Sequence, residues 1–569
     1  MAASALLGAR SQWTRRIARA DLEVWGQSDA PEVADLSGAG VVIGQIRWRT
    51  PEVPGRRETA EAYGKQLIRQ AWGSYVALLC DRKGWCALRD PSGHLDCLTW
   101  RRGGIWLIAS DIDELPRELL PSRMALDWDA LSLCAATGAA VIGRSPLDGV
   151  ATLTPGDLVV LAGRRAGEAQ PLWRPQDHVG DGSSVDDGQL VIAVEDSVSL
   201  ALEGAEPTLV EVSGGLDSSI IAGTAGRLGL GGRVAAALHF RSNRPESDES
   251  TWANSVATGQ GWPIFVGELS PGIFDPKNLF ELSCGARPAI NAMDLVRDAA
   301  TVAAAQAYSA GALVTGKGGD TVFFQPPTVD ILADYVLATG WRGLGGDLAQ
   351  GLARRLRRSV WSVGEEARHR LRDRAPPSLT SPLLGPRGRA QATTPIHPWM
   401  EGIDDLPPGK QRQIQGIVAT FNVRGVTRYA KEMAVRHPLL SQPVIEASLG
   451  IPTWRLAPGG RERGLARELF ADRVPESVLK RRSKGELGAY YARTIARSGD
   501  LLKPFLLDGV LCEAGVLDRN AVEAALAPDT LICHSENPAL MSATAVEAFA
   551  RYWQARLPDW PADARRRRD

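Results

Sequence analysis

The stretch VEVSGGLDSSIIAG, at residues 211–224, gathers groups that can bind a phosphate. Its apolar start predicts the end of a strand and its apolar end predicts a helix, so the polar residues fall in the turn between them. Glycines in such a turn let the backbone approach a ligand closely, and the free N–H groups at the start of the helix favour an anion. The residues that we expect to cradle the phosphate are Ser213, Gly214, Gly215, Leu216, Ser218 and Ser219.

Asp217 is the unusual member of this stretch, because a bare carboxylate repels phosphate. Its presence is explained if Mg²⁺ lies between the carboxylate and the phosphates. A second strand-end loop, GKGGD at 316–320, offers Gly318 and Gly319 for close approach and Asp320 as a second carboxylate for the same metal. The two loops together predict a Mg²⁺–nucleotide clamp. The alternative is a helix N-cap cluster in a glycine turn, which the density of SGGLDSS disfavours.

Residues 311–318, GALVTGKG, nearly match the phosphate-binding pattern GxxxxGK[ST]. Gly318 stands where that pattern needs a metal-binding hydroxyl, and the letters ALVT predict a strand where the pattern needs a loop. We therefore interpret this segment as a strand followed by the second Gly-rich loop.

The elements around these loops predict a parallel sheet. After residue 188, apolar runs at 207–212, 233–240 and 312–316 alternate with helical patterns at 218–229, 248–260 and 301–311, and such a sheet binds ligands at the carboxyl ends of its strands. Before residue 164, short Val-, Ile-, Leu- and Trp-rich runs separated by turns predict antiparallel strands. These runs lie at 40–48, 73–81, 84–90, 104–110 and 156–162.

Length and composition set the domain organisation. A chain of 569 residues is expected to hold at least two domains, and we place them at 1–165 and 189–569, with a linker at 166–188. From about residue 325 the chain is mostly helical, with a Pro- and Gly-rich interruption at 375–411, and we expect a helical insert at about 325–430 to shape the substrate cavity.

The charge and cysteine patterns exclude several classes. The formal net charge is -1, which argues against a nucleic-acid binder. The seven cysteines show no CxxC pair or zinc-ligand spacing, so neither a disulfide framework nor a zinc site is expected. No apolar run is long enough to span a bilayer. We expect a cytoplasmic enzyme.

The motif SGGLDSS resembles the pyrophosphate loop of the ATP pyrophosphatases that include asparagine synthetase and β-lactam synthetase, and GKGGD resembles their second Gly-rich loop. VRHPLLS (435–441) and RRSKGE (481–486) resemble two further segments of these enzymes. Residues 73–115 are similar to the glutaminase domain of asparagine synthetase. That domain's RDxxG turn corresponds to Arg89, Asp90 and Gly93, and its late AS[DE] motif to Ala109, Ser110 and Asp111.

The resemblance implies an α/β protein with two parts. The first is a degenerate glutaminase-like (Ntn-type) αββα sandwich, and the second is a Rossmann-like ATP pyrophosphatase domain that uses ATP and Mg²⁺. Lys484 falls where the family keeps a catalytic lysine that steadies charge on phosphate and on the tetrahedral oxyanion. Phe240, at the end of the second parallel strand, falls where adenine is recognised, although a core aromatic is the alternative.

Departures from the family pattern concern the source of the amine. Amidotransferases of the family use a cysteine exposed as residue 1, whereas Met1 is followed here by Ala2 and the earliest cysteine is Cys80. Lys317 replaces a usual Glu or Tyr, and Ala434 falls where asparagine synthetases have a glutamate. We therefore expect the amine not to come from glutamine.

Residues 397–416, HPWMEGIDDLPPGKQRQIQG, resemble a segment of lasso peptide cyclases, although a Pro-rich loop with a helix start is the alternative. Those macrolactam synthetases join a peptide's N-terminal amine to an Asp or Glu side chain through an acyl adenylate. This resemblance implies a core peptide as substrate, with a leader peptidase and a leader-recognition protein as pathway partners. A small-molecule amide synthetase and a catalytically idle scaffold remain alternatives.

Overall fold

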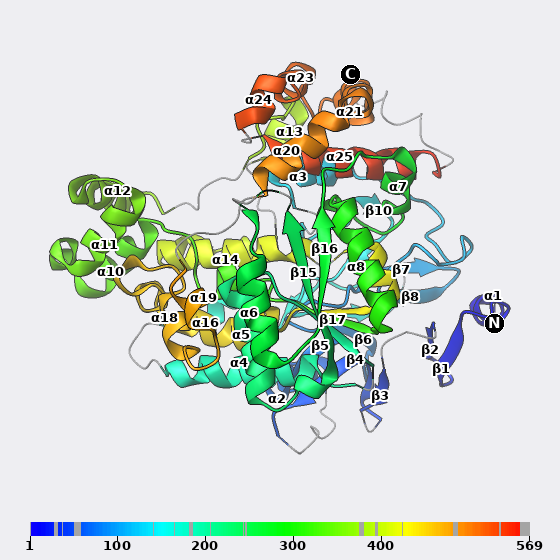
Figure 1. Cartoon of the computed structure of the whole chain (residues 1–569). Helices are drawn as coiled ribbons and strands as arrows, with labels where there is room; N and C mark the ends of the chain where they lie inside the picture. The colour runs from blue at the N-terminus through cyan, green and yellow to red at the C-terminus, as the bar shows by residue number, and fades with distance from the viewer. Residues whose placement is uncertain are drawn as a thin grey trace.

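The computed structural model of the chain is shown in Figure 1. It describes residues 2–27, 32–36, 38–50, 59–139, 142–163, 166–180, 186–204, 206–242, 244, 247–374, 380–392, 397–423, 425–481, 487–533 and 536–557.

The second half of the molecule, the name used here for everything from residue 186 onward, is built on a parallel five-stranded sheet. The order of the strands is β16-β15-β14-β17-β18. Helices α4, α5 and α6 pack side by side, and α8 packs on β15 and β16 (Figure 1). The bounds of the strands are β14 Thr208–Glu211, β15 Val234–Ser242, β16 Ile264–Leu269, β17 Ala312–Val314 and β18 Ala434–Arg436. The bounds of the helices are α4 Asp187–Ala201, α5 Leu216–Arg227, α6 Ser250–Gln260, α7 Pro276–Glu281, α8 Leu295–Tyr308 and α9 Gly319–Val322.

Burial explains why these segments form a parallel sheet. Leu209 and Val210 of β14 are fully buried, as are Ala236, Ala237 and Leu238 of β15. Continuous buried runs of this kind are typical of parallel strands that are covered on both faces. The predicted alternation of β14, α5, β15, α6, α8 and β17 is confirmed.

Two strands of this sheet were not predicted. β16 is an edge strand with an alternating burial pattern and an internal Gly267, and β18 has only three residues. Neither gives a strong local pattern, and β18 is brought to the sheet by pairing with β17, more than a hundred residues earlier.

The first half of the molecule, the name used here for the residues up to 180, is built on antiparallel sheets. The largest has six strands in the order β13-β12-β6-β5-β4-β3, and a second has three in the order β11-β7-β8. The predicted strands are observed as β4, β5, β6, β8 and β12. The bounds of the strands are β1 Thr14–Ala18, β2 Glu23–Gly26, β3 Val33–Asp35, β4 Gly40–Trp48, β5 Ala71–Asp81, β6 Gly84–Arg89, β7 Leu98–Arg102, β8 Ile105–Ala109, β9 Ala125–Leu126, β10 Leu147–Asp148, β11 Ala151–Thr152, β12 Asp157–Leu161 and β13 Gln170–Pro171. The helices are α1 Ala2–Gly8, α2 Ala60–Gln70 and α3 Trp128–Thr137.

The remainder is mostly helical, as predicted. Helices α10, α11 and α12 form a group at one side of the molecule, and α20 to α25 lie together near the described C-terminal end (Figure 1). The bounds are α10 Asp330–Thr339, α11 Asp347–Leu356, α12 Val360–Arg372, α13 Pro386–Gln391, α14 Pro408–Thr420, α15 Arg428–Glu432, α16 Gln442–Gly450, α17 Thr453–Leu456, α18 Gly464–Leu469, α19 Glu476–Leu479, α20 Gly488–Arg497, α21 Gly499–Leu507, α22 Val510–Glu513, α23 Arg519–Ala525, α24 Pro528–Cys533 and α25 Asn537–Gln554.

The segment 397–416 is part of the folded core. Trp399 is fully buried, and its indole N–H donates to the backbone oxygen of Pro155 at 3.1 Å. Lys410, near the start of α14, is also buried. Within the described residues, none of the helices has both the length and the apolar character that crossing a membrane requires.

Candidate nucleotide site

The predicted phosphate loop lies between β14 and α5, at the carboxyl end of a central strand. Gly214 has a φ of 76°, a conformation that favours glycine. A Cβ atom at this position would also lie 2.9 Å from the Cβ of Trp252 on α6. The loop therefore needs glycine here both for its backbone turn and for its packing.

The serines of the loop divide into two groups. Ser219 is fully buried and donates to the backbone oxygen of Gly215 at 2.7 Å, so its hydroxyl holds the helix start. Ser213 and Ser218 line the pocket, and their hydroxyl oxygens lie 3.1 Å apart. Gly215, the N-cap of α5, supplies no side-chain cap. The first N–H groups of α5 are therefore disposed to receive an anion, as expected at a helix start of this kind.

The second Gly-rich loop packs directly on the first. A Cβ atom at Gly316 would lie 2.6 Å from the backbone nitrogen of Ser218, and one at Gly319 would lie 2.4 Å from the Cγ of Asp217. Gly318, with a φ of 94°, turns the chain into α9. Contact between the two loops therefore requires Gly316 and Gly319, and the turn into α9 requires Gly318.

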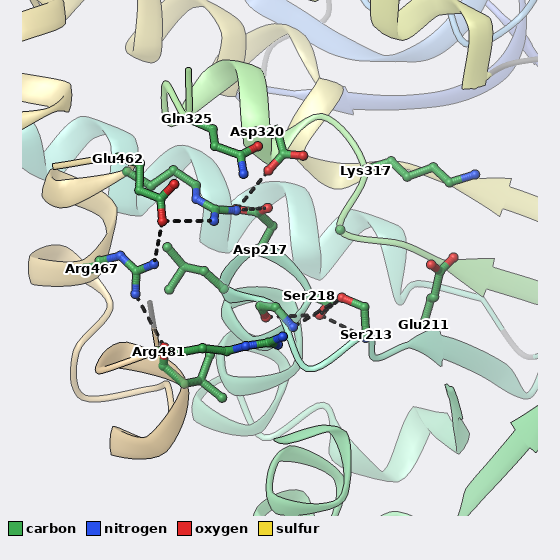
Figure 2. A pocket seen from close by; sticks show the side chains of 15 residues that line it. Glu211, Ser213, Asp217, Ser218, Lys317, Asp320, Gln325, Glu462, Arg467 and Arg481 are labelled. Carbon is green, nitrogen blue, oxygen red and sulfur yellow. Dashed lines mark hydrogen bonds and ion pairs between the residues drawn. The ribbon is translucent and has the colours of Figure 1, made fainter. Parts of the chain in front are cut away.

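The two predicted aspartates, Asp217 and Asp320, both form an ion pair with the guanidinium of Arg463. Nη1 of Arg463 lies 2.8 Å from Oδ2 of Asp217 and 2.9 Å from Oδ1 of Asp320. Because both distances share one nitrogen atom, the two carboxylates face the same point in space. Figure 2 shows the two aspartates reaching this point from separate loops.

Arg463 is held in place by an unusual backbone. It precedes α18 with a φ of 50°, in the left-handed region that non-glycine residues rarely occupy, and its N–H donates to the oxygen of Phe324 at 3.1 Å. Only 6% of its side chain is exposed. Burial alone would lower the pKa of Arg463, but the charges of Asp217, Asp320 and Glu462 outweigh it and raise the pKa.

Two further arginines close the pocket. Arg481 donates through Nη1 to the oxygen of Gly214 at 3.1 Å and forms an ion pair with Glu249, so it fixes the first loop to α6. Arg467 donates to the oxygen of Leu479 at 2.8 Å. The pocket has a volume of about 230 Å³. Its lining residues are Glu211, Ser213, Gly215, Leu216, Asp217, Ser218, Gly316, Lys317, Asp320, Gln325, Glu462, Arg463, Arg467, Val478 and Arg481.

The opposite wall of the pocket carries Glu211 and Lys317, which lie away from Glu462 and Arg467 in Figure 2. Glu211, the last residue of β14, forms an ion pair with Arg297 of α8. Burial would raise the pKa of Glu211, but the charges of Arg297 and Lys317 outweigh it and lower the pKa. Glu211 is therefore a carboxylate at neutral pH and makes this wall polar.

The positions of the remaining predicted residues differ. Phe240 is not among the residues that line this pocket, and its ring packs against Arg297, whose Cζ lies 4.3 Å from the ring centroid; its role in adenine recognition stays a prediction. Four other predicted residues do not line the pocket but determine the shape of the two loops: Gly214, Ser219, Gly318 and Gly319. Lys484 falls within residues 482–486, outside the described part of the chain, so its role stays a prediction.

Sequence reasoning missed Arg463 and Arg467, the cations of the GRERGLAR segment. Their run of arginines is the only signal that the sequence offers, and it resembles a solvated surface. VRHPLLS, in contrast, was singled out by its resemblance, and it packs against the second Gly-rich loop. His437 shares a hydrogen bond of 2.7 Å with Thr315, and a Cβ atom at Gly318 would clash with Leu440.

The comparison with known proteins agrees with this geometry. Residues 189–553 match the family described as asparagine synthase. The chain belongs to the asparagine synthase family. No curated protein matches the chain. An asparagine synthase domain implies an ATP-dependent ligase that forms a carbon–nitrogen bond and releases AMP.

The residues present fit the phosphates of ATP and a divalent cation. The start of α5 and the hydroxyls of Ser213 and Ser218 can receive phosphate oxygens. In the described part of the chain, no three His, Cys, Asp or Glu side chains are grouped so that they could hold a metal ion. Mg²⁺ does not need such a group, because it is usually held by one or two carboxylates together with substrate phosphates and waters. The guanidinium between Asp217 and Asp320 marks a position where a cation is favoured.

Proposed function

We propose that this member of the asparagine synthase family is a macrolactam synthetase. It adenylates an Asp or Glu side chain of a core peptide and joins it to the peptide's N-terminal amine, releasing AMP and pyrophosphate. The observation that carries the adenylation half is the convergence of Asp217 and Asp320 beside the first turn of α5.

The reaction requires activation of the carboxylate, because oxide is a poor leaving group. Attack of the carboxylate on the α-phosphorus releases pyrophosphate, whose charge the start of α5 and the serine hydroxyls stabilise. Asp217 and Asp320 would hold Mg²⁺, which neutralises phosphate charge when bound. Lys484 would stabilise the charge on phosphate and on the oxyanion formed when the amine attacks.

Three cysteines of the first half, Cys86, Cys97 and Cys134, support an amine source other than glutamine. Burial raises the pKa of Cys86 to about 11 and that of Cys97 and Cys134 to about 12. A thiol attacks as its thiolate, so these three groups are inert at neutral pH. We interpret the antiparallel half as a glutaminase-like αββα sandwich that has a structural role.

The choice of a peptide rests on the resemblance of residues 397–416 to lasso peptide cyclases. Prefolding of the peptide in the cavity would hold amine and adenylate together, which can remove about 7–11 kcal/mol of the barrier. A leader peptidase and a leader-recognition protein would then deliver the core peptide.

The test is the reaction of a leader-free core peptide with ATP and Mg²⁺. The peptide is expected to lose one water and to block its N-terminus, with AMP and pyrophosphate formed in matching amounts. Mass spectrometry of the peptide and chromatography of the nucleotides measure both. If the peptide stays linear while a free amino-acid derivative is adenylated, the protein is instead a small-molecule amide synthetase.

Glutamine provides the matched control for the amine source. Added with ATP, it is expected to yield no glutamate above background. Glutamate release at the rate of AMP formation would contradict the proposal and would give the antiparallel half a catalytic role.

A further inference from the structure

We propose that Arg463 is a pyrophosphate-binding residue that occupies the metal's place until the phosphates arrive. The proposal rests on the assignment of Asp217 and Asp320 to a divalent cation. It goes beyond that assignment because it gives the site a third, mobile participant and makes metal and phosphate binding mutually dependent.

The first observation is competition for the same oxygens. The Nη1 atom of Arg463 contacts both Asp217 and Asp320 at hydrogen-bond distance. A divalent cation held by these carboxylates would lie close to this nitrogen, and two cations cannot share the position. The metal and the guanidinium therefore exclude each other between the aspartates.

The second observation is that Arg463 has hydrogen-bonding capacity left over. Its side chain is 6% exposed, yet its Nε atom is buried without a hydrogen-bond partner. Leaving a buried charged group incompletely hydrogen-bonded costs free energy. A ligand with several acceptor oxygens, such as pyrophosphate, removes this cost, and the pocket that holds such a ligand is lined by Arg463.

The third observation is the backbone that aims the side chain. A left-handed φ at an arginine is strained, and such strain persists where surrounding contacts hold it, often at ligand-binding sites. The N–H of Arg463 donates to the oxygen of Phe324, so the backbone keeps the side chain directed at the pocket. A small rotation would transfer its guanidinium from the aspartates to phosphate oxygens in the same pocket.

The consequence is a coupled exchange of partners. When the phosphates bind, Arg463 moves to them and releases Asp217 and Asp320 to the metal. Without phosphates, the metal must displace the guanidinium of Arg463 from both carboxylates and therefore binds weakly. Because coupling between two ligands is reciprocal, the metal also favours phosphate binding.

Two titrations with single ligands test this exchange in the full-length protein. Mn²⁺ alone is titrated by electron paramagnetic resonance, and inorganic pyrophosphate alone is titrated by calorimetry in metal-free buffer. In Arg463→Gln, Mn²⁺ is expected to bind about tenfold more tightly and pyrophosphate about tenfold more weakly, since one charge-assisted interaction is removed in each case. Arg461→Gln is the matched control, because Arg461 is exposed, lies two residues away and is expected to change neither affinity.

Opposite shifts of the two affinities support the proposal, whereas unchanged affinities or shifts in the same direction overturn it. If Arg463→Gln does not fold, Arg463→Lys is measured instead. The same opposite shifts of the Mn²⁺ and pyrophosphate affinities are then expected, at smaller size. Wild-type affinities in Arg463→Lys would overturn the proposal. Asp320→Asn in the Arg463→Gln background is expected to remove the tightened Mn²⁺ binding. Mn²⁺ binding that survives this change would show that the metal assignment fails, while the pyrophosphate titration still tests Arg463. No peptide is present, so failure of the macrolactam proposal is measured separately.

Discussion

At the scale of single residues, the site balances the buried charge of Arg463 against carboxylates of different exposure. Asp217 and Asp320 offset the positive charge of Arg463. Glu462 lies between Arg463 and Arg467 and forms an ion pair with each of them. The exposed fractions of the two aspartate side chains, 14% and 47%, place Asp217 at the base of the site and Asp320 at its rim.

Replacing either aspartate tests the site directly. Asp217→Asn and Asp320→Asn are each expected to lower ATP-dependent AMP formation by about a hundredfold or more, because preorganised charge at the phosphates is lost. Both variants should remain folded, since each leaves Arg463 one carboxylate. AMP formation and thermal unfolding are measured in parallel, with exposed Asp508→Asn as control. Near-normal turnover in either variant would show that its carboxylate is not needed.

Asp111, in the segment that resembles the glutaminase domain, is expected to make stability depend on pH. Burial of its carboxyl group, with the charge of Asp113, raises the pKa of Asp111 to about 7, above the ordinary value of 3.8. The folded protein therefore binds this proton more tightly than the unfolded chain does, and the resulting stability is lost as pH rises from about 4 to about 7.

The difference in the free energy of unfolding between wild type and Asp111→Asn is therefore expected to become less favourable to wild type as the pH rises from about 4 to about 7. Urea unfolding of both proteins at several pH values measures the difference. The same pH dependence in both would mean that the carboxyl of Asp111 is not protonated preferentially in the folded state.

At the scale of elements, Lys410 connects two helices of the second half. Lys410 belongs to α14, and its Nζ donates to the backbone oxygen of Ser448 in α16 at 3.2 Å. It also donates to the backbone oxygen of Ile451, the residue that follows α16. A cation at a helix C-terminus is favoured by the helix dipole, and burial without these partners would be costly. Burial lowers the pKa of Lys410 to about 7.

Lys410→Met is expected to lower the free energy of unfolding by about 1–3 kcal/mol, because the buried carbonyls lose their donor. Lys480→Met is the control, since the side chain of Lys480 is 74% exposed and its ion pair contributes little. Urea denaturation measures both. Equal midpoints for the two variants would mean that the carbonyls of α16 are satisfied without Lys410.

The same scale explains what the sequence could predict. The turns SGGLDSS and GKGGD were predictable because each places its chemistry within a few residues of a strand and a helix. Arg463 was not, because it meets Asp217 across 246 positions of the chain and through a left-handed backbone that local patterns do not encode. The surroundings of Phe240 were likewise not predictable, because the residue that packs on its ring, Arg297, belongs to α8, a separate element further along the chain.

At the scale of the whole molecule, the two halves share their cores. One apolar cluster joins Leu67 and Trp173 of the first half to Val194 of the second, and another joins Leu131 of α3 to Phe549 of α25. Ion pairs also cross between the halves, including Arg287 with Asp96 at 2.7 Å and Lys431 with Asp113 at 2.8 Å. Shared apolar cores of this kind couple the stabilities of the parts they join.

The chain is therefore expected to unfold in one calorimetric transition, and residues 189–569 produced alone should aggregate or melt at a clearly lower temperature. Removing the first half would uncover Trp399, which is fully buried in the intact chain and packs against the ring of Trp173, and a large apolar side chain loses about 1.5–3 kcal/mol of burial free energy when it is exposed. Lys431→Gln in the full chain separates this apolar effect from the ion pairs, because the Lys431 side chain is 41% exposed and an exposed pair contributes about 1 kcal/mol or less. Light scattering and circular dichroism follow the truncated protein. A monomeric truncated protein that melts at the temperature of the full chain and forms AMP would show that the second half folds and acts alone, and that the antiparallel half contributes nothing to the stability of the nucleotide site.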